Sequence, residues 1–257
     1  MAMVASLINM KGGVGKSTLT FNLAWYSAWF GNLKVLAIDL DPQANLSQYF
    51  LGALAYLELL SQDKTKTIVE VFEQIPATSA SSGAPTLIDP ADVIVKLHEW
   101  DDGSWLHLVP SRLELAWTLK NPTEKAQLLP QFISRVKENY DLILIDCAPT
   151  ESILTNAAYR SSRYVFVPVK PEFLATIGLP LLARSLNEFS LMHQNQKLEM
   201  GGIIFNDMWR SNTPPEQKKS CRDVRSAAKE HGRQVFNNVA HHSDSYATGS
   251  REGTPIF

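Results

Sequence analysis

The feature that most constrains this chain is the stretch M-K-G-G-V-G-K-S-T at residues 10–18. It fits the phosphate-loop pattern G-x-x-x-x-G-K-[ST] when the first glycine is relaxed, and it carries a second lysine, Lys11, at its entrance. The apolar residues 4–9 predict a buried strand before the loop, and residues 17–30 predict a helix after it. Because the motif requires a strand–loop–helix frame, we interpret the stretch as a phosphate-binding loop rather than a glycine-rich surface turn.

The chemistry of such a loop gives each residue type a task. Glycines let the backbone turn so that its N–H groups face a polyphosphate without a Cβ clash. The Lys16 ammonium is expected to reach the β- and γ-phosphates, and the Ser17 hydroxyl is expected to coordinate Mg²⁺. The N-terminus of the following helix adds partial positive charge beneath the phosphates.

Two carboxylates follow the next apolar stretch, residues 34–38. Asp39 and Asp41 lie where open α/β sheets bind ligands, just past a strand's carboxyl end, and Pro42 stops the strand. The functional interpretation places Asp39 near the Mg²⁺ shell and lets Asp41 orient an attacking water. The alternative is a solvated Asp-Pro turn, and the phosphate loop one helix earlier favours function.

A third motif ends at Asp146, after the apolar residues 142–145. An apolar strand that ends in aspartate matches a Walker B strand, so Asp146 is expected to hold Mg²⁺, usually through water, opposite Ser17. At the end of a later strand, residues 200–206, Asn206 could hydrogen-bond an adenine edge. Asn206 as a simple turn former is an equally open interpretation.

The order of elements predicts the fold class. Strands are expected at 105–110 and 163–169 besides those above, and helices at 51–60, 67–74, 121–140 and 173–188, with a loop at 76–90. Alternating strands and helices form right-handed βαβ units and a parallel sheet. We therefore expect one α/β domain over residues 1–257: a P-loop NTPase-like, doubly wound, mostly parallel sheet with helices on both faces.

Composition excludes several classes. The 257 residues include only two cysteines, Cys147 and Cys221, which provide neither a disulfide framework nor a cysteine-based metal site. The chain shows no signal-peptide pattern and no apolar run of about 18 residues, so a membrane span is not expected. A net charge of −2 gives no global nucleic-acid signal.

Any DNA contact must therefore come from a local basic patch, and residues 209–233 carry one, with seven basic against three acidic residues. Lys218, Arg222 and Arg225 share one helical face, as their spacing of four and three residues implies. Such a cluster could bind DNA phosphates without reading sequence, although a solvated helix face is the commoner outcome. The candidate DNA-binding residues are Arg210, Lys218, Lys219, Arg222 and Arg225.

Taken together, the motifs resemble the deviant-Walker-A ATPases, and most closely the ParA/Soj partition branch. The resemblance rests on K-G-G-V-G-K-S-T at 11–18, D-L-D-P-Q-A-N at 39–45 and D-L-I-L-I-D-C-A-P at 141–149. V-P-V-K-P-E-F at 167–173, G-I-I-F-N at 202–206 and S-R-E-G-T-P-I at 250–256 extend it over nearly the whole chain.

The resemblance implies an ATP-driven homodimer in which Lys11 reaches across to the partner's phosphates and acts in catalysis with Lys16 and Asp41. It implies that Thr18 contacts the α-phosphate, and that Ser17, Asp39 and Asp146 serve Mg²⁺. The nucleotide-binding set it implies is Gly12, Gly13, Val14, Gly15, Lys16, Ser17, Thr18 and Asn206.

The resemblance also implies partners. The ATP dimer would bind nonspecific DNA, and a ParB-like or cargo adaptor protein would stimulate hydrolysis, so the protein is expected in the cytoplasm on the nucleoid. A MinD-like membrane ATPase is the alternative, but residues 251–257 are short and contain Gly and Pro, unlike an amphipathic membrane helix. A reductase resembling the nitrogenase iron protein lacks suitably placed cysteines, and the aspartate at 41 argues against a scaffold without turnover.

Overall fold

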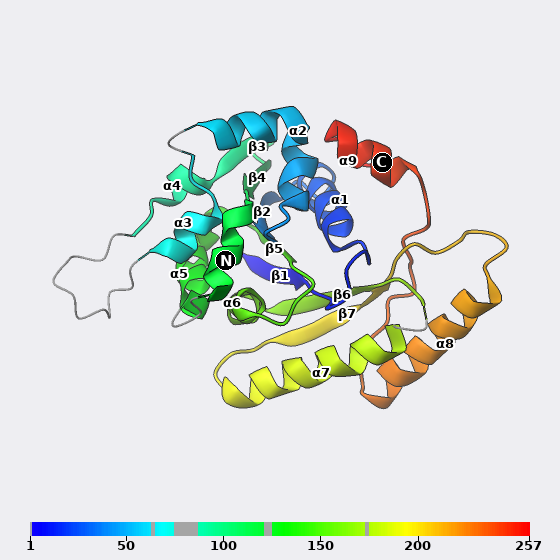
Figure 1. The fold of residues 1–257 in the computed structure, drawn as a ribbon. Coiled ribbons are helices and arrows are strands. Elements are labelled where there is room, and N and C mark those ends of the chain that lie inside the picture. The colour runs from blue at the N-terminus through cyan, green and yellow to red at the C-terminus, as the bar shows by residue number, and fades with distance from the viewer. Residues whose placement is uncertain (1, 63–64, 75–86, 121–124, 173–174) are drawn as a thin grey trace.

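The protein was analysed as a computed structural model that describes residues 2–62, 65–74, 87–120, 125–172 and 175–257. These residues form a seven-stranded sheet in the order β3-β4-β2-β5-β1-β6-β7 (Figure 1). All neighbouring strands are parallel except β3 and β4, which are antiparallel. The expected mostly parallel α/β fold is confirmed. The strands are β1 Met3–Leu7, β2 Lys34–Leu40, β3 Val95–Glu99, β4 Trp105–Val109, β5 Leu142–Cys147, β6 Tyr164–Val169 and β7 Glu199–Phe205.

Helices cover both faces of the sheet, because the central strands are apolar on both sides. In β2, Leu36 and Ile38 face one core, whereas Val35 and Ala37 face the other. The first core is covered by α3, α5, α6, α7 and α8, and the second by α1 and α2. The α-helices are α1 Lys16–Trp29, α2 Asn45–Ser61, α3 Ile68–Glu73, α4 Pro90–Val93, α5 Leu128–Val136, α6 Ile153–Ser161, α7 Ala175–Met192, α8 Pro215–Glu230 and α9 Ser245–Glu252.

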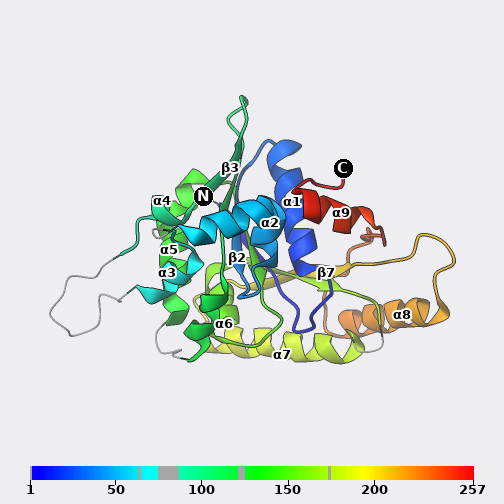
Figure 2. The ribbon, with the colours of Figure 1, turned by 45° about the horizontal axis from the view of Figure 1, so that its top comes forward.

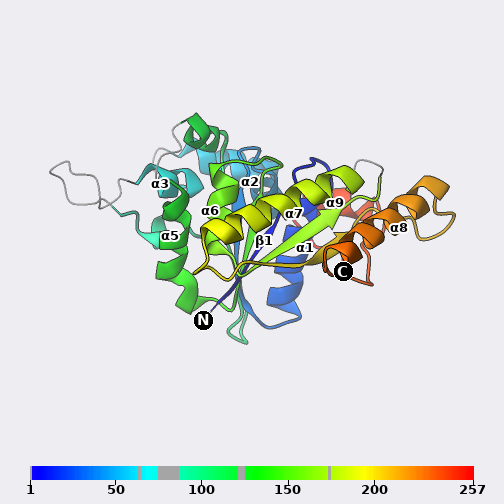
Figure 3. The same ribbon diagram turned by 90° about the horizontal axis from the view of Figure 1, so that it is seen from below.

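The C-terminal region returns to the side of the sheet that carries α1. There α9 packs against α2 (Figure 2), and the Ile256 N–H donates to Asn22 Oδ1 at 3.1 Å. On the other side, α7 and α8 lie side by side (Figure 3). The helix pair α7 and α8 therefore lies on the opposite face of the sheet from α1 and α2.

Three sequence predictions need correction. The helix expected at 51–60 is longer, because α2 begins at Asn45 and bends at Gly52, whose φ of 73° only glycine adopts readily. The antiparallel edge strand β3 was not predicted at all. The helix expected at 121–140 is in fact α5 flanked by the 3₁₀ turns η2 Lys125–Gln127 and η3 Lys137–Asn139, since Pro130 fits only the first turn of a helix.

The remaining predictions agree with the observed elements to within a few residues. The predicted helix at 67–74 is α3, which Thr67 and Glu70 cap reciprocally. Residues 76–86 of the predicted loop, the expected cap Asn121 and the predicted helix start at Phe173 lie outside the described residues.

Candidate functional site

The phosphate loop connects β1 to α1 in a conformation that favours glycine. Gly13 and Gly15 have φ values of 71° and 88°. A Cβ at Gly15 would also collide with the side-chain amide of Asn206, whose Nδ2 donates to the Val14 carbonyl at 2.9 Å. The end of β7 is thereby tied to the loop, so Asn206 lies at the expected site and braces it.

Lys16 points into the site from the first turn of α1. Its side chain is buried, and its Nζ donates to the Lys11 carbonyl at 3.3 Å. Burial lowers the pKa of Lys16, and the nearby Asp146 carboxylate opposes that shift. A buried cation with one carbonyl partner has donor capacity left for a phosphate.

The two strand-end carboxylates stand opposite each other, because β2 and β5 pair with Asp39 beside Asp146. Asp39 is fully buried and accepts three hydrogen bonds: from the Ser47 N–H at 2.8 Å, the Ser47 hydroxyl at 2.6 Å and the Asp41 N–H at 3.1 Å. Burial raises the pKa of Asp39 to about 7, against the effect of these donors. Asp39 therefore holds the turn after β2 in place.

Asp146 is equally buried, but neither of its carboxylate oxygens has a hydrogen-bond partner in the part of the chain that the structure describes. Burial raises its pKa well above the ordinary value, and Asp39 raises it further. The Ser17 hydroxyl is near enough to favour the ionised form without completing a hydrogen bond. Two unpartnered buried oxygens fit the needs of a hydrated cation between Asp146 and Ser17.

No group of three histidine, cysteine or acidic side chains gathers to hold a metal ion among the described residues. Mg²⁺ rarely uses an all-protein cage and usually takes one or two protein ligands together with water and substrate phosphates. The Asp146–Ser17 pair suits that mode of binding.

Asp41 begins the turn that follows β2. Its Oδ1 accepts from the Gln43 N–H at 2.9 Å, and its carbonyl accepts from the Ala44 N–H at 2.9 Å. Asp41 is 7% exposed, so its carboxylate lies at the border of the buried site with one oxygen unengaged in this turn. A carboxylate in that position can accept a proton or a hydrogen bond from a water.

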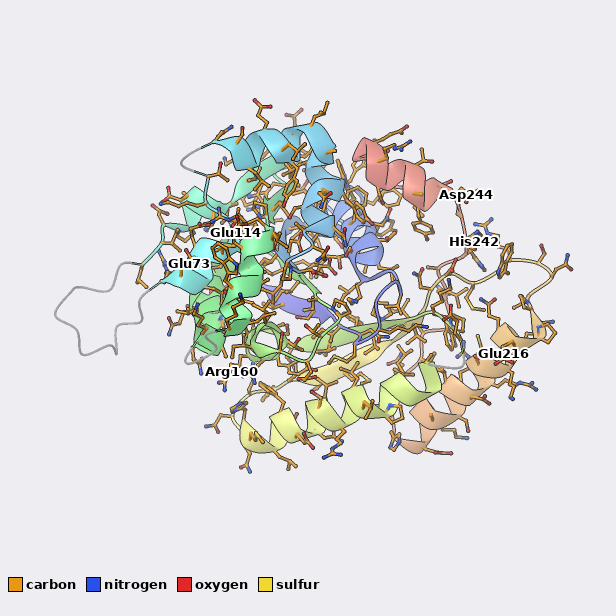
Figure 4. All side chains as sticks on the ribbon, in the orientation of Figure 1. Glu73, Glu114, Arg160, Glu216, His242 and Asp244 are labelled. Atoms are coloured by element: carbon orange, nitrogen blue, oxygen red, sulfur yellow. The ribbon has the colours of Figure 1, made fainter. Side chains whose placement is uncertain are left out.

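A cavity of about 650 Å³ extends from the phosphate loop toward α9. Its lining includes Gly13, Gly15 and Thr18 together with residues 241–244, 246 and 247. His242 and Asp244 are labelled in Figure 4 on the segment that leads into α9. The volume is typical of a small-molecule pocket.

Asp207 and His242 are among the residues of this cavity that sequence reasoning did not select. His242 Nδ1 lies 2.6 Å from Asp207 Oδ1, and the His242 ring stacks on Trp209 at 4.8 Å between centroids. Asp207 directly follows the predicted Asn206 at the carboxyl end of β7, which is the signal that could have identified it.

Lys11 lies at the mouth of the site and is paired within its own subunit. Its Nζ forms an ion pair with Glu172, and its N–H donates to Asn9 Oδ1 at 2.9 Å. The hydrogen bond from Lys11 holds the pKa of Glu172 below its usual range. Glu172, like Asp207 and His242, is a residue that sequence reasoning did not select.

The basic candidates lie on α8 and on the loop before it, and Gln217 of α8 donates to the Asp207 carbonyl at 3.1 Å. Gln217, Ser220, Val224 and Ala228 are the buried side of α8. Lys218, Lys219, Arg222 and Arg225 are exposed on the remaining surface, with Arg210 on the preceding loop. The Arg225 guanidinium also lies 5.1 Å from the Phe205 ring centroid, which holds it against the body of the protein.

The comparisons with known proteins agree with this geometry. A family model described as an AAA domain matches residues 2–200. The sporulation initiation inhibitor protein Soj of Bacillus subtilis is 31% identical over 206 residues, which cover 79% of this chain and 72% of that protein. This chain belongs to the ParA/Soj family of partition ATPases. It is therefore an ATPase.

Two further relatives extend the match over the whole chain. The chromosome-partitioning ATPase Soj of Treponema pallidum is 28% identical, with 97% of this chain and 87% of that protein covered. The apo structure of McdA from Cyanothece superposes with a TM-score of 0.81 at 20% identity, over 100% of this chain and 92% of that one. This last likeness shows the shared fold. Among the described residues, no helix combines the length and apolar character needed to cross a membrane.

Proposed function

We propose that this ATPase is a nucleotide-operated switch. In its ATP form it pairs with a second copy, binds DNA without sequence preference, and positions a plasmid, a chromosome locus or another cargo. A partner protein on the cargo stimulates hydrolysis and releases the switch. The observation that carries the proposal is the joint presence of a phosphate loop, the open Asp146 site and an exposed basic helix, α8, in one ParA/Soj-type fold.

Different residues of the site bind the phosphates of ATP and the Mg²⁺ ion. Backbone N–H groups of the loop and the Lys16 ammonium hold the phosphates, and Thr18, which lines the cavity, contacts the α-phosphate. Ser17 and Asp146 are the residues that would hold Mg²⁺, and Asp39 supports them by fixing the turn after β2. Bound Mg²⁺ would offset the negative charge on the phosphates.

Hydrolysis needs a water that is oriented toward the γ-phosphate, and Asp41 is the carboxylate at the border of the site. Lys11 supplies a cation to the phosphates of the partner subunit, which stabilises charge in the transition state. Asn206 and the adjacent cavity rim receive the adenine. A switch must stay in its ATP state until its partner arrives. We therefore expect the protein alone to hydrolyse ATP slowly and the partner protein to accelerate hydrolysis.

The DNA-binding step uses charge alone. The exposed residues of α8 would contact phosphates, and their release of counterions makes binding salt-sensitive and independent of sequence. The Arg225 guanidinium also lies over the Phe205 ring, so this contact competes with binding to a DNA phosphate. The MinD-like alternative, a membrane-surface ATPase, would instead require an apolar face on the binding helix.

The test measures binding to unrelated DNA duplexes with ATP, ADP or no nucleotide across a salt series. We expect salt-sensitive binding with ATP alone, and longer-lived binding for Asp41→Ala because hydrolysis no longer ends the ATP state. The double variant Lys218→Glu/Arg222→Glu should lose binding, whereas Lys96→Glu, on the opposite edge strand β3, should not. Absence of DNA binding in every nucleotide state would overturn the DNA step and leave the ATPase.

A further inference from the structure

In the proposed dimer Lys11 reaches the phosphates of the partner subunit, yet in this structure its ammonium is paired within its own chain. The ammonium forms an ion pair with Glu172, a residue 161 positions away on the segment that follows β6. The side chains of Lys11 and Glu172 are 31% and 44% exposed, so the pair lies at the surface of the site. An exposed ion pair is weak enough to be exchanged for another.

The fold builds this contact. Asn9 connects the two segments, because its Oδ1 accepts from the Lys11 N–H at 2.9 Å and its Nδ2 donates to the Pro168 carbonyl at 2.7 Å. Pro168 belongs to β6, which runs parallel to β1 and leads directly to Glu172. The loop entrance and the end of β6 are therefore held together by a buried amide, and Lys11 meets Glu172 as a consequence.

Glu172 also has a second cation at hand. Lys170 Nζ lies 3.5 Å from Glu172 Oε1 and 2.7 Å from Asp207 Oδ2. If Lys11 leaves, Glu172 keeps Lys170 as a partner, so no carboxylate is left without a counter-charge. The arrangement suits a contact that must open and close repeatedly.

We propose that Glu172 is a positioning residue that holds Lys11 in the free subunit and releases it to the nucleotide of the partner subunit. The proposal rests on the proposed function, since it concerns the step in which two ATP-bound subunits pair. Each subunit must give up one Lys11–Glu172 pair before the dimer closes. A triphosphate presents more negative charge than a diphosphate, so it competes better with Glu172 for the ammonium.

The Lys11–Glu172 ion pair influences the ATP concentration at which dimers form. A subunit whose Lys11 is held is not competent to pair, and the apparent affinity falls with the competent fraction. Glu172→Gln removes the charge but keeps the size of the side chain. We therefore expect it to lower the half-saturating ATP concentration for dimerisation by about two- to fivefold, the range that partly exposed ion pairs support.

The experiment follows dimer formation by analytical ultracentrifugation across an ATP titration, with turnover measured in parallel. Glu188→Gln is the matched control, because Glu188 also forms an exposed ion pair, with Arg184 on α7, away from the loop. We expect no shift for the control. At saturating ATP the turnover per Glu172→Gln dimer should equal that of the wild type, because Glu172 acts before the dimer closes.

A double-mutant cycle with Lys11→Ala separates positioning from a general structural effect. In the Lys11→Ala background, Glu172→Gln should no longer shift the titration, since there is no ammonium to hold. An equal shift in both backgrounds, or weaker dimerisation of Glu172→Gln, overturns the proposal while the dimer switch stands. If the wild type forms no dimer at any ATP concentration, the proposed function fails as well.

Discussion

Two buried polar side chains in this sheet differ in how far their neighbours satisfy them. At the carboxyl ends of β2 and β5, Asp146 is fully buried and neither of its oxygens has a hydrogen-bond partner among the described residues. At the antiparallel edge, His107 on β4 is also buried, but its Nδ1 lies 2.9 Å from the Tyr140 hydroxyl, and its Nε2, which completes no hydrogen bond within the described part of the chain, faces Glu99 Oε1 at 3.4 Å.

The difference separates a carboxylate that can take a ligand from a histidine that serves the fold. An unpaired buried polar group destabilises a protein by about 1–3 kcal/mol, so it persists where a ligand completes it. The Asp146 site is open toward the phosphate loop and fits that description. His107 has one ring nitrogen at hydrogen-bond distance from a hydroxyl and the other facing a carboxylate, as expected of a residue that only holds an edge strand in place.

The largest expected effect comes from Asp146→Asn, which keeps the shape of the side chain and removes its charge. We expect ATPase activity to fall about 10–100-fold, the loss that follows removal of groups that orient a metal and its ligands. At the same time the free energy of unfolding without nucleotide should rise, because the repulsion between the buried Asp39 and Asp146 carboxyl groups is gone. Turnover assays and urea denaturation in the absence of Mg²⁺ measure the two effects.

Asp39→Asn is the matched control for that experiment, since Asp39 occupies the paired position on the neighbouring strand. Its three donors lose a carboxylate acceptor, so this variant should become less stable. If both asparagine variants lose stability equally, the distinction between an open and a satisfied carboxylate is wrong.

Sequence reasoning predicted the individual carboxylates but could not distinguish their states. Asp39 and Asp146 each end an apolar stretch, which is a local signal, and the pattern placed both at the edge where the strands end. The strand pairing that sets them side by side joins residues 107 positions apart, and the Ser47 contacts depend on where α2 begins. Neither the strand pairing nor the Ser47 contacts can be predicted from a short stretch of sequence.

The same limit explains what was missed elsewhere. Glu172 and His242 acquire roles only because β6, β7 and the segment before α9 converge on the phosphate loop. By contrast, β3 could have been predicted, since V-K-L-H-E at 95–99 alternates apolar and polar residues. Its short length and exposed charges are typical of an edge strand and made the signal weak.

An intermediate effect is expected from Ser47→Ala, which removes one of the three hydrogen bonds that Asp39 accepts. The Ser47 hydroxyl donates to Asp39 at 2.6 Å and accepts from the Ser111 N–H at 2.9 Å, so it joins the ends of β2 and β4. Its loss should lower the free energy of unfolding by about 1–2 kcal/mol and leave a buried N–H unpaired. Ser61→Ala, on the exposed end of α2, should change stability by less than about 0.5 kcal/mol.

The smallest effect should appear at the antiparallel edge, as a change of stability with pH. Burial lowers the pKa of His107, and Glu99 only partly opposes that shift. Above pH of about 6.5 the imidazole is neutral in both the folded and the unfolded chain, so its contribution is constant. As the pH falls below 6.5, the unfolded chain binds the proton more readily, and stability declines until the pH passes the folded-state pKa.

Urea denaturation at pH 7.5 and 5.5 measures this decline in the wild type and in His107→Gln, with His231→Gln as an exposed control. The wild type should lose about 1 kcal/mol at most more than His107→Gln over that interval, and the control should follow the wild type. The ATPase activity of His107→Gln at pH 7.5 should stay near that of the wild type, because the edge cluster has no contact with the phosphate loop in the described residues. A large loss of turnover would show that the edge cluster serves the reaction, and the comparison between an open functional site and a satisfied structural one would then fail.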